Sequence, residues 1–529
     1  MKCVLKKGSN QIIIKGKENI DWFIFFTTVL IILSLCIPLI ITPELTNQIL
    51  NKAYDYVATN LGPTYMVMGI STLIFLLILA LSTYGNLVIG NEHEQPEYGL
   101  FGWSSMLFCS GIGASLVLWG TTEWVYYYLE PPFNAEPESI EAIAWATSYG
   151  IFHWGITGWA LYCLPAVAMA YAYHVRNYGT LRTSTACQSI LGNKASGVGG
   201  RIIDLIYMVA LLGVLAGGLG FTTPTISANV TEFFGIEESL TVTISVLFIC
   251  LLIFATSVHF GIERGIQKLS KFCVYLALFL LVYILIFGPT SFIVKTSLDS
   301  LIFTTKHFIE MNIGPAPFGK SDFSKTWTVF YWAWFIGLGP FIGIFVARIS
   351  RGRTLRTMIF GVLGFGTMGC ALFFMIMGNN ALYLELNGLM PIVEIMNNEG
   401  AAIMTSKSVL AMPMGKWILP ILGLFGLIFM ATTYDSGAYI LASGATKKMQ
   451  SGDNPEKWHR VFWAITIGLL PLGLLILSSE ATDPIERLRP FQTIILLISP
   501  PLIIVYILMA MSLIKSIRED TKTKLEGTI

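Results

Sequence analysis

Long apolar runs recur along almost the whole chain of 529 residues. A helix needs about 20 mostly apolar residues to cross a bilayer. Twelve runs reach this length: 21–42, 64–90, 100–129, 142–173, 202–233, 239–258, 272–294, 326–347, 357–379, 417–445, 461–478 and 490–514. Two further stretches, 298–312 and 382–397, mix polar and apolar residues and predict amphipathic helices at the membrane interface. The pattern therefore predicts an all-α integral membrane protein with twelve transmembrane helices.

The distribution of positive charge supports this count. Lys and Arg are enriched in the cytoplasmic connections of membrane proteins. With the N-terminus in the cytoplasm, 24 of the 33 Lys and Arg residues fall in inside segments and 9 in outside segments. Both termini are therefore predicted to be cytoplasmic. One inside connection, 91–99, is acidic and departs from the pattern.

Composition excludes several other classes of protein. Only 12% of the residues are charged and 54% are hydrophobic, whereas a soluble domain carries about 25% charged residues. The net charge of +1 offers no basic face for nucleic acid. The eight Cys are scattered without C-x-x-C spacing, which favours small buried side chains over disulfides or metal sites. The six His stand apart and no H-E-x-x-H or G-x-S-x-G motif occurs, so no enzyme is expected.

Two runs contain residues that interrupt a helix. The third holds Gly111–Ser115 near its middle, and the eighth holds Gly337–Pro340. Close helix packing through small residues explains either feature alone. Interruptions at matching positions, five runs apart, instead predict an inverted-repeat transporter with five helices per repeat. This interpretation gives an N-terminal tail (1–20), two additional helices (21–99), a first repeat (100–297), an amphipathic helix and loop (298–325), a second repeat (326–514) and a C-terminal tail (515–529).

Aromatic residues gather inside three of the runs instead of at the membrane interfaces, where Trp is usually enriched. They lie in Glu123–Tyr128, in Trp327–Phe335, and at Trp154, Trp159 and Tyr162. Packing within the bundle explains any one of them. Together they suit a quaternary ammonium ligand, because such a cation has no N–H group and is recognised by cation–π attraction.

The run TWTVFYWAWF, followed by Pro340-Phe341 and the stretch ARISRGRT, resembles the signature of the betaine/choline/carnitine transporter family. The similarity continues through the Gly-rich third run, GTTE, Pro131-Pro132-Phe133, FHWG and ATTYDS, and so covers nearly the whole chain. The resemblance implies a LeuT-type fold, usually a homotrimer, in the plasma membrane of a prokaryote. It also implies alternating-access transport of a small trimethylammonium compound.

The resemblance also implies a set of substrate-binding residues. Carried over position by position, these are Trp154, Trp159, Tyr162, Trp334, Phe335, Tyr126, Gly111, Gly113, Ser115, the vestibule residue Trp327, and Leu338. The chain departs from the family pattern at three places. Phe335 replaces a second Trp, Thr326 replaces a small or acidic residue, and Ala114-Ser115 replaces Ile-Gly. A smaller ring at 335 widens the cage, so a betaine bulkier than glycine betaine is an alternative substrate.

A sodium site is the expected source of coupling. Sodium takes hard oxygen ligands, including carbonyls at an unwound helix. The hydroxyls of Thr432 and Thr433, with the carbonyls of Cys109, Ile112 and Phe429, match the sodium site of the family's symporters. The alternative is that the Thr hydroxyls bond back to their own helix. The resemblance favours the sodium site, and no other cofactor is expected.

Two acidic residues, together with the fifth and seventh runs, bear on the mechanism of ion coupling. The family's sodium-independent exchangers carry an Arg where this chain has Cys273, and they lack an acid at the position of Asp435. The fifth run has no hydroxyls in Ala216–Leu219, so one Na⁺ is predicted. The alternatives are sodium-independent carnitine/betaine-type antiport and proton-coupled choline-type uptake. Glu123 is expected to hold the third run in place through hydrogen bonds, and proton coupling through Glu123 is the alternative.

Overall fold

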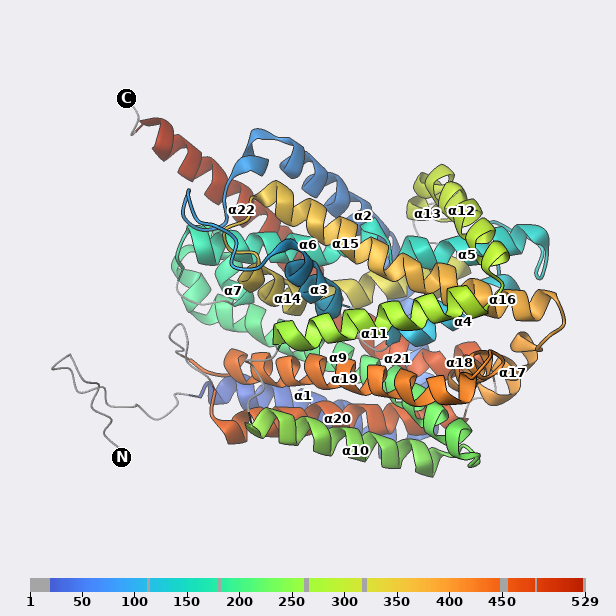
Figure 1. The fold of residues 1–529 in the computed structure, drawn as a ribbon. Helices are drawn as coiled ribbons and strands as arrows, with labels where there is room; N and C mark the ends of the chain where they lie inside the picture. The colour runs from blue at the N-terminus through green and yellow to red at the C-terminus, as the bar shows by residue number, and fades with distance from the viewer. Residues whose placement is uncertain are drawn as a thin grey trace.

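The computed structural model describes residues 20–111, 115–178, 182–260, 266–315, 321–447, 455–480 and 483–526. These residues fold into a bundle of helices, and the only strand-like pairings among them are two isolated bridges (Figure 1). Helices dominate because a backbone in hydrocarbon must satisfy its polar groups within the segment. The all-α prediction is confirmed.

Ten helical segments in the described part of the chain are long and apolar enough to cross a membrane. They are built from α1 (Trp22–Ile41), α2 (Pro43–Leu81), α5 (Ile140–His153) with α6 (Ile156–Ala170) and η2 (Tyr171–Val175), α9 (Val198–Phe234), α11 (Ile266–Phe287), η5 (Ser324–Thr328) with α14 (Val329–Ile349), α15 (Leu355–Phe373) with η6 (Phe374–Gly378) and α16 (Asn379–Leu386), α19 (Gly415–Gly444), α20 (Lys457–Glu480) and α22 (Pro500–Glu526).

Two shorter apolar helices, α3 (Leu100–Gly111) and α10 (Leu240–Phe260), overlap the third and sixth predicted runs. The remaining elements are η1 (Thr83–Asn86), α4 (Ser115–Leu129), α7 (Thr183–Ala186), α8 (Gln188–Leu191), η3 (Gly192–Ser196), α12 (Thr290–Lys306), α13 (Phe308–Ile313), α17 (Ile392–Glu399), α18 (Ala401–Leu410) and α21 (Pro484–Ile498). Ten segments thus meet the length criterion, and a count of twelve spans stays a prediction.

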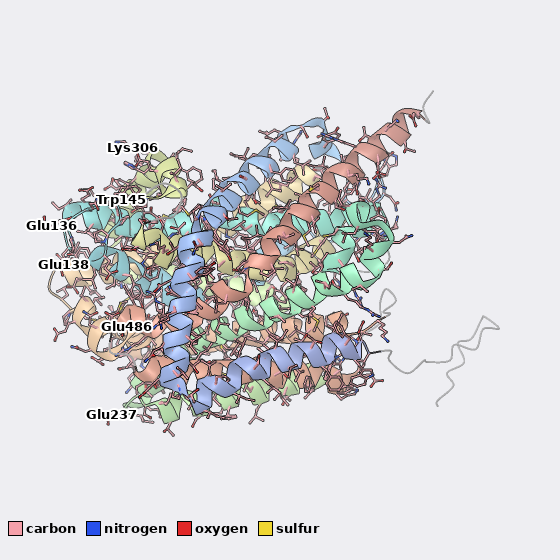
Figure 2. All side chains as sticks on the ribbon, turned by 180° about the vertical axis from the view of Figure 1, so that it is seen from behind. Glu136, Glu138, Trp145, Glu237, Lys306 and Glu486 are labelled. Carbon is pink, nitrogen blue, oxygen red and sulfur yellow. The ribbon has the colours of Figure 1, made fainter. Side chains whose placement is uncertain are left out.

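Prolines account for two differences between the predicted and observed bounds. The second predicted run, 64–90, overlaps α2, which already begins at Pro43 and ends at Leu81. A proline inside a helix bends it, and α2, which contains Pro63, is bent in Figure 2. The last predicted run, 490–514, is divided between α21 and α22, because Pro500 opens a new helix in the position where proline is favoured. The helix α22 then continues to Glu526, through most of the predicted C-terminal tail.

The two ends of the bundle carry different connections. Glu136, Glu138, Glu237, Lys306 and Glu486, all in connections predicted to face outside, lie together at one end in Figure 2. The first turn of α1 and the last turn of α22 lie at the opposite end. These five residues and the two helix ends therefore lie at opposite ends of the bundle.

The structure tests only one of the two predicted helix interruptions. The first falls on residues 112–114, which lie outside the described part, between α3, described up to Gly111, and α4, described from Ser115. The interruption predicted at Gly337–Pro340 is wrong, because α14 runs continuously through it. Pro340 leaves the Ile336 carbonyl without its helical donor, and the Tyr506 hydroxyl bonds this carbonyl at 3.2 Å.

An interruption that was not predicted divides the fourth run instead. The helix α5 ends at His153 and α6 begins at Ile156, so Trp154 and Gly155 form the junction. Gly155 in the FHWG stretch was the available signal, since glycine permits backbone that other residues avoid. The matching positions that suggested an inverted repeat are therefore not both present, and the repeat stays a prediction.

Candidate functional site

The junction between α5 and α6 fixes the position of Trp154. The Trp154 amide donates to the Gly150 carbonyl at 3.1 Å, and the Gly155 amide donates to the Phe152 carbonyl at 3.1 Å. A Cβ at Gly155 would lie 2.6 Å from the Ile151 carbonyl oxygen, so a larger residue does not fit there. The sequence thereby ends one helix and starts the next at the first of the predicted substrate residues.

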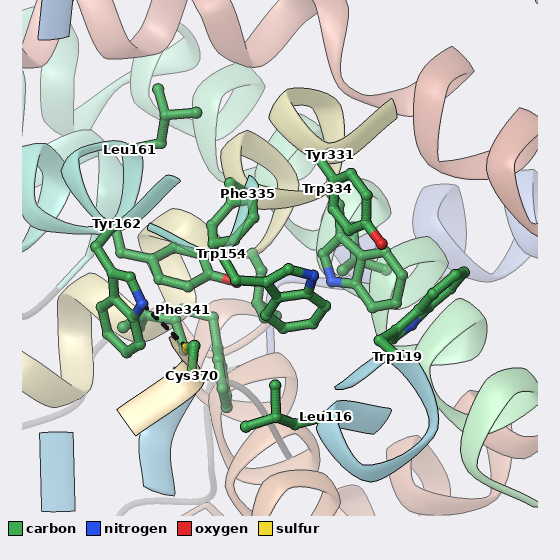
Figure 3. Close-up of a cluster of buried hydrophobic side chains, with 14 of the residues drawn as sticks. Leu116, Trp119, Trp154, Leu161, Tyr162, Tyr331, Trp334, Phe335, Phe341 and Cys370 are labelled. Atoms are coloured by element: carbon green, nitrogen blue, oxygen red, sulfur yellow. Dashed lines mark hydrogen bonds between the residues drawn. The ribbon is translucent and has the colours of Figure 1, made fainter. Parts of the chain in front are cut away.

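Four of the predicted substrate residues, Trp154, Trp159, Tyr162 and Phe335, form one buried group that we call the aromatic site. Trp159 and Tyr162 are three residues apart on α6 and share a face, with ring centroids 5.5 Å apart. The Phe335 ring of α14 lies 4.7 Å from Tyr162 and 6.0 Å from Trp154. Figure 3 shows Tyr162, Phe335 and Trp154 in succession.

Close packing of α6 against α14 brings these rings together. A Cβ on Gly158 would lie 2.9 Å from the tip of the Phe335 ring, so glycine allows the ring to reach the α6 backbone. On its other side, the Trp159 indole N–H donates to the Cys370 sulfur of α15 at 3.4 Å. The aromatic site is therefore held by three helices, and its rings are fixed before any ligand arrives.

Three other predicted substrate residues lie outside this group of ring contacts. Trp334, one position before Phe335, faces α9 and stacks on Phe221 at 5.3 Å. Tyr126 contacts the Trp327 ring at 4.9 Å near the start of α14. These buried residues line a second aromatic region between α4, α9 and α14 instead of completing the first.

Tyr331 and Trp119 join the two regions, Phe374 adds a ring to the aromatic site, and all three were missed by the sequence reasoning. The Tyr331 ring lies 5.7 Å from Trp154 and 6.0 Å from Trp119, and Phe374 lies 5.9 Å from Trp154. Tyr331 could have been found, because it precedes Phe335 by one helical turn in the same aromatic run. Phe374 begins the π-helical turn η6, and no local pattern in the sequence marks it.

The remaining predicted substrate residues are placed as follows. Leu338 is buried one turn after Phe335 on α14. Ser115 is buried at the first position of α4, and Gly111 is the last residue of α3. Gly113 lies outside the described residues, as does Ile112 of the predicted sodium site.

A fully buried carboxylate lies directly behind the aromatic site. Glu123 of α4 accepts a hydrogen bond from the Trp154 indole N–H at 3.0 Å and another from the Tyr331 hydroxyl at 2.7 Å, both at Oε2. The Tyr127 hydroxyl donates to Oε1 at 2.5 Å. The carboxylate therefore ties α4 to the helix junction and to α14, which is the hydrogen-bonding role expected for it.

His153 extends this polar cluster toward the start of α14. Its Nδ1 lies 2.9 Å from the Tyr127 hydroxyl and 3.4 Å from Glu123 Oε1, while its Nε2 lies 3.0 Å from the Thr328 hydroxyl. The imidazole also stacks on Tyr331 at 4.7 Å. Every polar atom of the ring thus has a partner, as buried polar groups require.

The structure brings the end of α3 next to α19, where the sodium ligands were predicted. The Phe108 and Phe429 rings meet at 6.4 Å. The Thr433 hydroxyl donates to the Phe429 carbonyl of its own helix at 3.0 Å, which is the alternative considered for it. The Cys109 thiol donates to the Ser270 carbonyl at 3.5 Å and also forms a hydrogen bond with the free Cys273 thiol. The side chain of Thr432 lies outside the described part of the chain.

The ARISRGRT stretch contacts the connection that contains Ile89 and Glu94. The Ile89 amide donates to the Arg353 carbonyl at 2.8 Å, and the Arg351 guanidinium pairs with Glu94 at 2.5 Å. The Asn91 amide and then the Arg351 charge lower the pKa of Glu94 below its ordinary value. This contact explains the acidic connection at 91–99, and it gives the arginines of the stretch a structural role away from the aromatic site.

Ten helices long and apolar enough to cross a membrane define a multi-pass membrane protein as the class. Comparison of the sequence with family models gives the particular family. The model of the BCCT family, the betaine/carnitine/choline family transporters, matches residues 23–522. The chain belongs to this family, whose members are transporters and not enzymes.

Two relatives show how far the similarity extends. The chain is 33% identical over 443 residues to the uncharacterized transporter YeaV of Escherichia coli (strain K12), covering 84% of this chain and 90% of the relative. It is 31% identical over 437 residues to a carnitine transporter of Acinetobacter baumannii (strain ATCC 19606), covering 82% of this chain and 79% of the relative.

Proposed function

We propose that the protein takes up a trimethylammonium compound by alternating access, with the cationic group held in the aromatic site. The carrying observation is that the Phe335 ring of α14 lies 4.7 Å from the Tyr162 ring of α6 and 6.0 Å from the Trp154 ring at the junction before α6. A quaternary ammonium offers no hydrogen-bond donor, and each desolvated aromatic contact contributes about 2 kcal/mol. Several rings are therefore needed, and this group supplies them.

Carnitine or a betaine of similar size is the proposed substrate. Phe335 is smaller than the Trp that the family pattern has at this position, so the site accommodates more than the headgroup of glycine betaine. Leu338, one turn further along α14, adds an apolar wall. The relative named a carnitine transporter supports the same choice.

Sodium coupling with one Na⁺ is the proposed driving mechanism. The ring contact between Phe108 near the end of α3 and Phe429 of α19, with centroids 6.4 Å apart, supports it. Cys273 stands where the family's sodium-independent exchangers carry an Arg, and this difference also supports sodium coupling. The second candidate is sodium-independent antiport, in which the Thr433 hydroxyl serves only its own helix by donating to the Phe429 carbonyl.

The assembly and orientation follow from the family and the charge pattern. We propose a homotrimer in the plasma membrane of a prokaryote, with both termini in the cytoplasm. Membership of the family supports the first point, and the excess of Lys and Arg in the inside connections supports the second.

Transport by the purified protein in proteoliposomes tests the function. Labelled carnitine, glycine betaine and choline are offered with an inward sodium gradient or with potassium alone. We expect saturable uptake of a trimethylammonium compound that the sodium gradient drives. Uptake that ignores sodium but requires unlabelled substrate inside indicates antiport, and no uptake of any of the three contradicts the proposed substrate class.

A pair of threonine variants locates the coupling site. Thr433→Val removes the proposed sodium ligand, and Thr466→Val removes an equivalent hydroxyl that bonds the Phe462 carbonyl within α20 at 2.9 Å. The sodium concentration for half-maximal uptake is expected to rise about tenfold or more in Thr433→Val and to stay unchanged in Thr466→Val. Equal behaviour of the two variants would remove Thr433 from the sodium site.

A further inference from the structure

The Glu123 carboxylate accepts hydrogen bonds from three neighbouring side chains. A tyrosine hydroxyl and an indole N–H each carry one hydrogen. Trp154, Tyr331 and Tyr127 lie at 3.0, 2.7 and 2.5 Å from the two carboxylate oxygens. The indole N–H has no acceptor capacity, so it can only donate to the carboxylate. Three neutral donors around one buried carboxyl group form the environment of an anion.

No cation balances this charge among the ion pairs of the described residues, apart from the neighbouring imidazole. In its neutral form, the His153 imidazole has a hydrogen-bond partner for each of its two ring nitrogens. Its Nδ1–H donates to the Tyr127 oxygen, whose hydrogen is used on Glu123, and its Nε2 accepts from the Thr328 hydroxyl. This tautomer is assigned from the hydrogen-bond network. The cluster as a whole then carries one negative charge inside the bundle.

The charge lies immediately behind the wall of the aromatic site. Trp154 and Tyr331 hold the carboxylate on one side, and their rings contribute to the aromatic surface on the other, with Trp154 6.0 Å from Phe335. A carboxylate that accepts from the indole N–H increases the electron density of the ring and so strengthens its attraction for a cation. The low dielectric constant inside the bundle also strengthens the direct Coulomb attraction between the carboxylate and the cation.

We infer that Glu123 is a specificity-determining and positioning residue of the substrate site. It fixes Trp154 and Tyr331, and its negative charge selects a quaternary ammonium over a neutral group of the same shape. This inference rests on the proposed function, because it assigns the charge to the recognition of that ligand. Glu123 acts through the rings and does not need to touch the substrate.

The experiment compares two ligands of one shape. Binding of carnitine, and of the carnitine analogue in which carbon replaces the quaternary nitrogen, is measured calorimetrically on the purified protein. The ratio of the two dissociation constants gives the preference for the cation. A residue that only maintains the fold affects both ligands alike, so this ratio separates the charge from the scaffold.

The variants isolate the charge. Glu123→Gln is expected to reduce the preference for the cation about tenfold, and Glu123→Asp to restore part of it. Tyr331→Phe keeps the charge and loses one donor, so it should weaken both ligands and retain the preference. Glu238→Gln is the matched control, because Glu238 also accepts three hydrogen bonds from neutral donors, the hydroxyls of Ser227, Thr231 and Thr243, at the α9–α10 turn.

The outcomes separate this inference from the proposed function. An unchanged preference in Glu123→Gln, whether or not affinity falls, overturns the inference and leaves the function intact. The same holds if Glu238→Gln lowers the preference as much as Glu123→Gln does. A wild-type protein that binds neither carnitine nor glycine betaine overturns the proposed function, and the inference with it.

Discussion

Tyr506 of α22 replaces hydrogen bonds that two prolines remove from neighbouring helices. Pro165 deprives the Leu161 carbonyl of its donor, and Pro340 does the same to the Ile336 carbonyl, since proline has no N–H. The Tyr506 hydroxyl lies 2.9 Å from the first carbonyl oxygen and 3.2 Å from the second, so its single hydrogen is shared between them. One side chain thus supports both proline-freed carbonyls behind the aromatic site.

Tyr506→Phe is therefore expected to destabilise the protein by about 1–3 kcal/mol, the cost of leaving buried carbonyls unsatisfied. Tyr434→Phe is the control, because the Tyr434 hydroxyl bonds the Leu215 carbonyl at 2.8 Å in the regular part of α9. That carbonyl keeps the amide of Leu219 as its helical donor. Thermal unfolding in detergent should show the larger loss for Tyr506→Phe, and equal losses would contradict this account.

At the scale of the element, α15 holds the aromatic site from outside. Gly366 lies directly against the Trp159 indole, and a Cβ there would overlap the ring, whereas a Cβ on Gly364 would meet nothing within 4 Å. The same helix bears Cys370, which accepts from the Trp159 indole at 3.4 Å. The position of this tryptophan therefore depends on a neighbouring helix as much as on its own.

These two glycines give a matched pair of substitutions. Gly366→Ala should displace the Trp159 ring and weaken substrate binding about tenfold or more, since cation–π attraction depends on ring position. Gly364→Ala should leave binding unchanged and stabilise the helix by up to about 1 kcal/mol. Dissociation constants and unfolding temperatures of both variants check this, and unchanged binding in Gly366→Ala would show that Trp159 is not part of the site.

Helix interruptions show where the sequence was and was not informative. The interruption predicted at Gly111–Ser115 falls on residues 112–114, outside the described part, and stays a prediction. Gly337–Pro340 gave an equally strong signal and was wrong, because a hydroxyl from α22 satisfies the freed carbonyl. That donor lies 170 residues away in the chain, so no local pattern reveals it.

The aromatic site shows the same limit. Trp154, Trp159, Tyr162 and Phe335 were found through the family pattern, and they meet in the structure. The separation of Trp334 from this group follows from helix rotation, since consecutive residues on α14 point about 100° apart. Packing between helices decides whether Trp334 or Phe335 faces α6, and the local sequence pattern does not predict that packing.

The whole molecule has two chemically different ends. Glu237 lies at one end of the bundle, and the terminal turn of α22 lies at the other. At this second end the Arg176 guanidinium bonds Asp520 at 2.9 Å and Glu519 at 2.8 Å, which attaches α22 to the segment after η2. The positive-inside pattern assigns this end to the cytoplasm.

Labelling of intact cells with a membrane-impermeant maleimide tests that assignment. Glu237→Cys is expected to react from outside, and Lys515→Cys is expected to react only after the cells are opened. Each is compared with the parent protein, whose native cysteines set the background. Reaction of Lys515→Cys in intact cells, with protection of Glu237→Cys, would reverse the orientation.

The central claim is that the aromatic site binds a trimethylammonium group. Tryptophan fluorescence of the purified protein, titrated with carnitine, glycine betaine, choline and proline betaine with and without Na⁺, tests it most directly. We expect saturable quenching by at least one of them, tightened by Na⁺ and weakened about fivefold to thirtyfold in Tyr162→Leu, which retains all 13 Trp. No response to any of the four compounds, or equal affinity in Tyr162→Leu, would contradict the account.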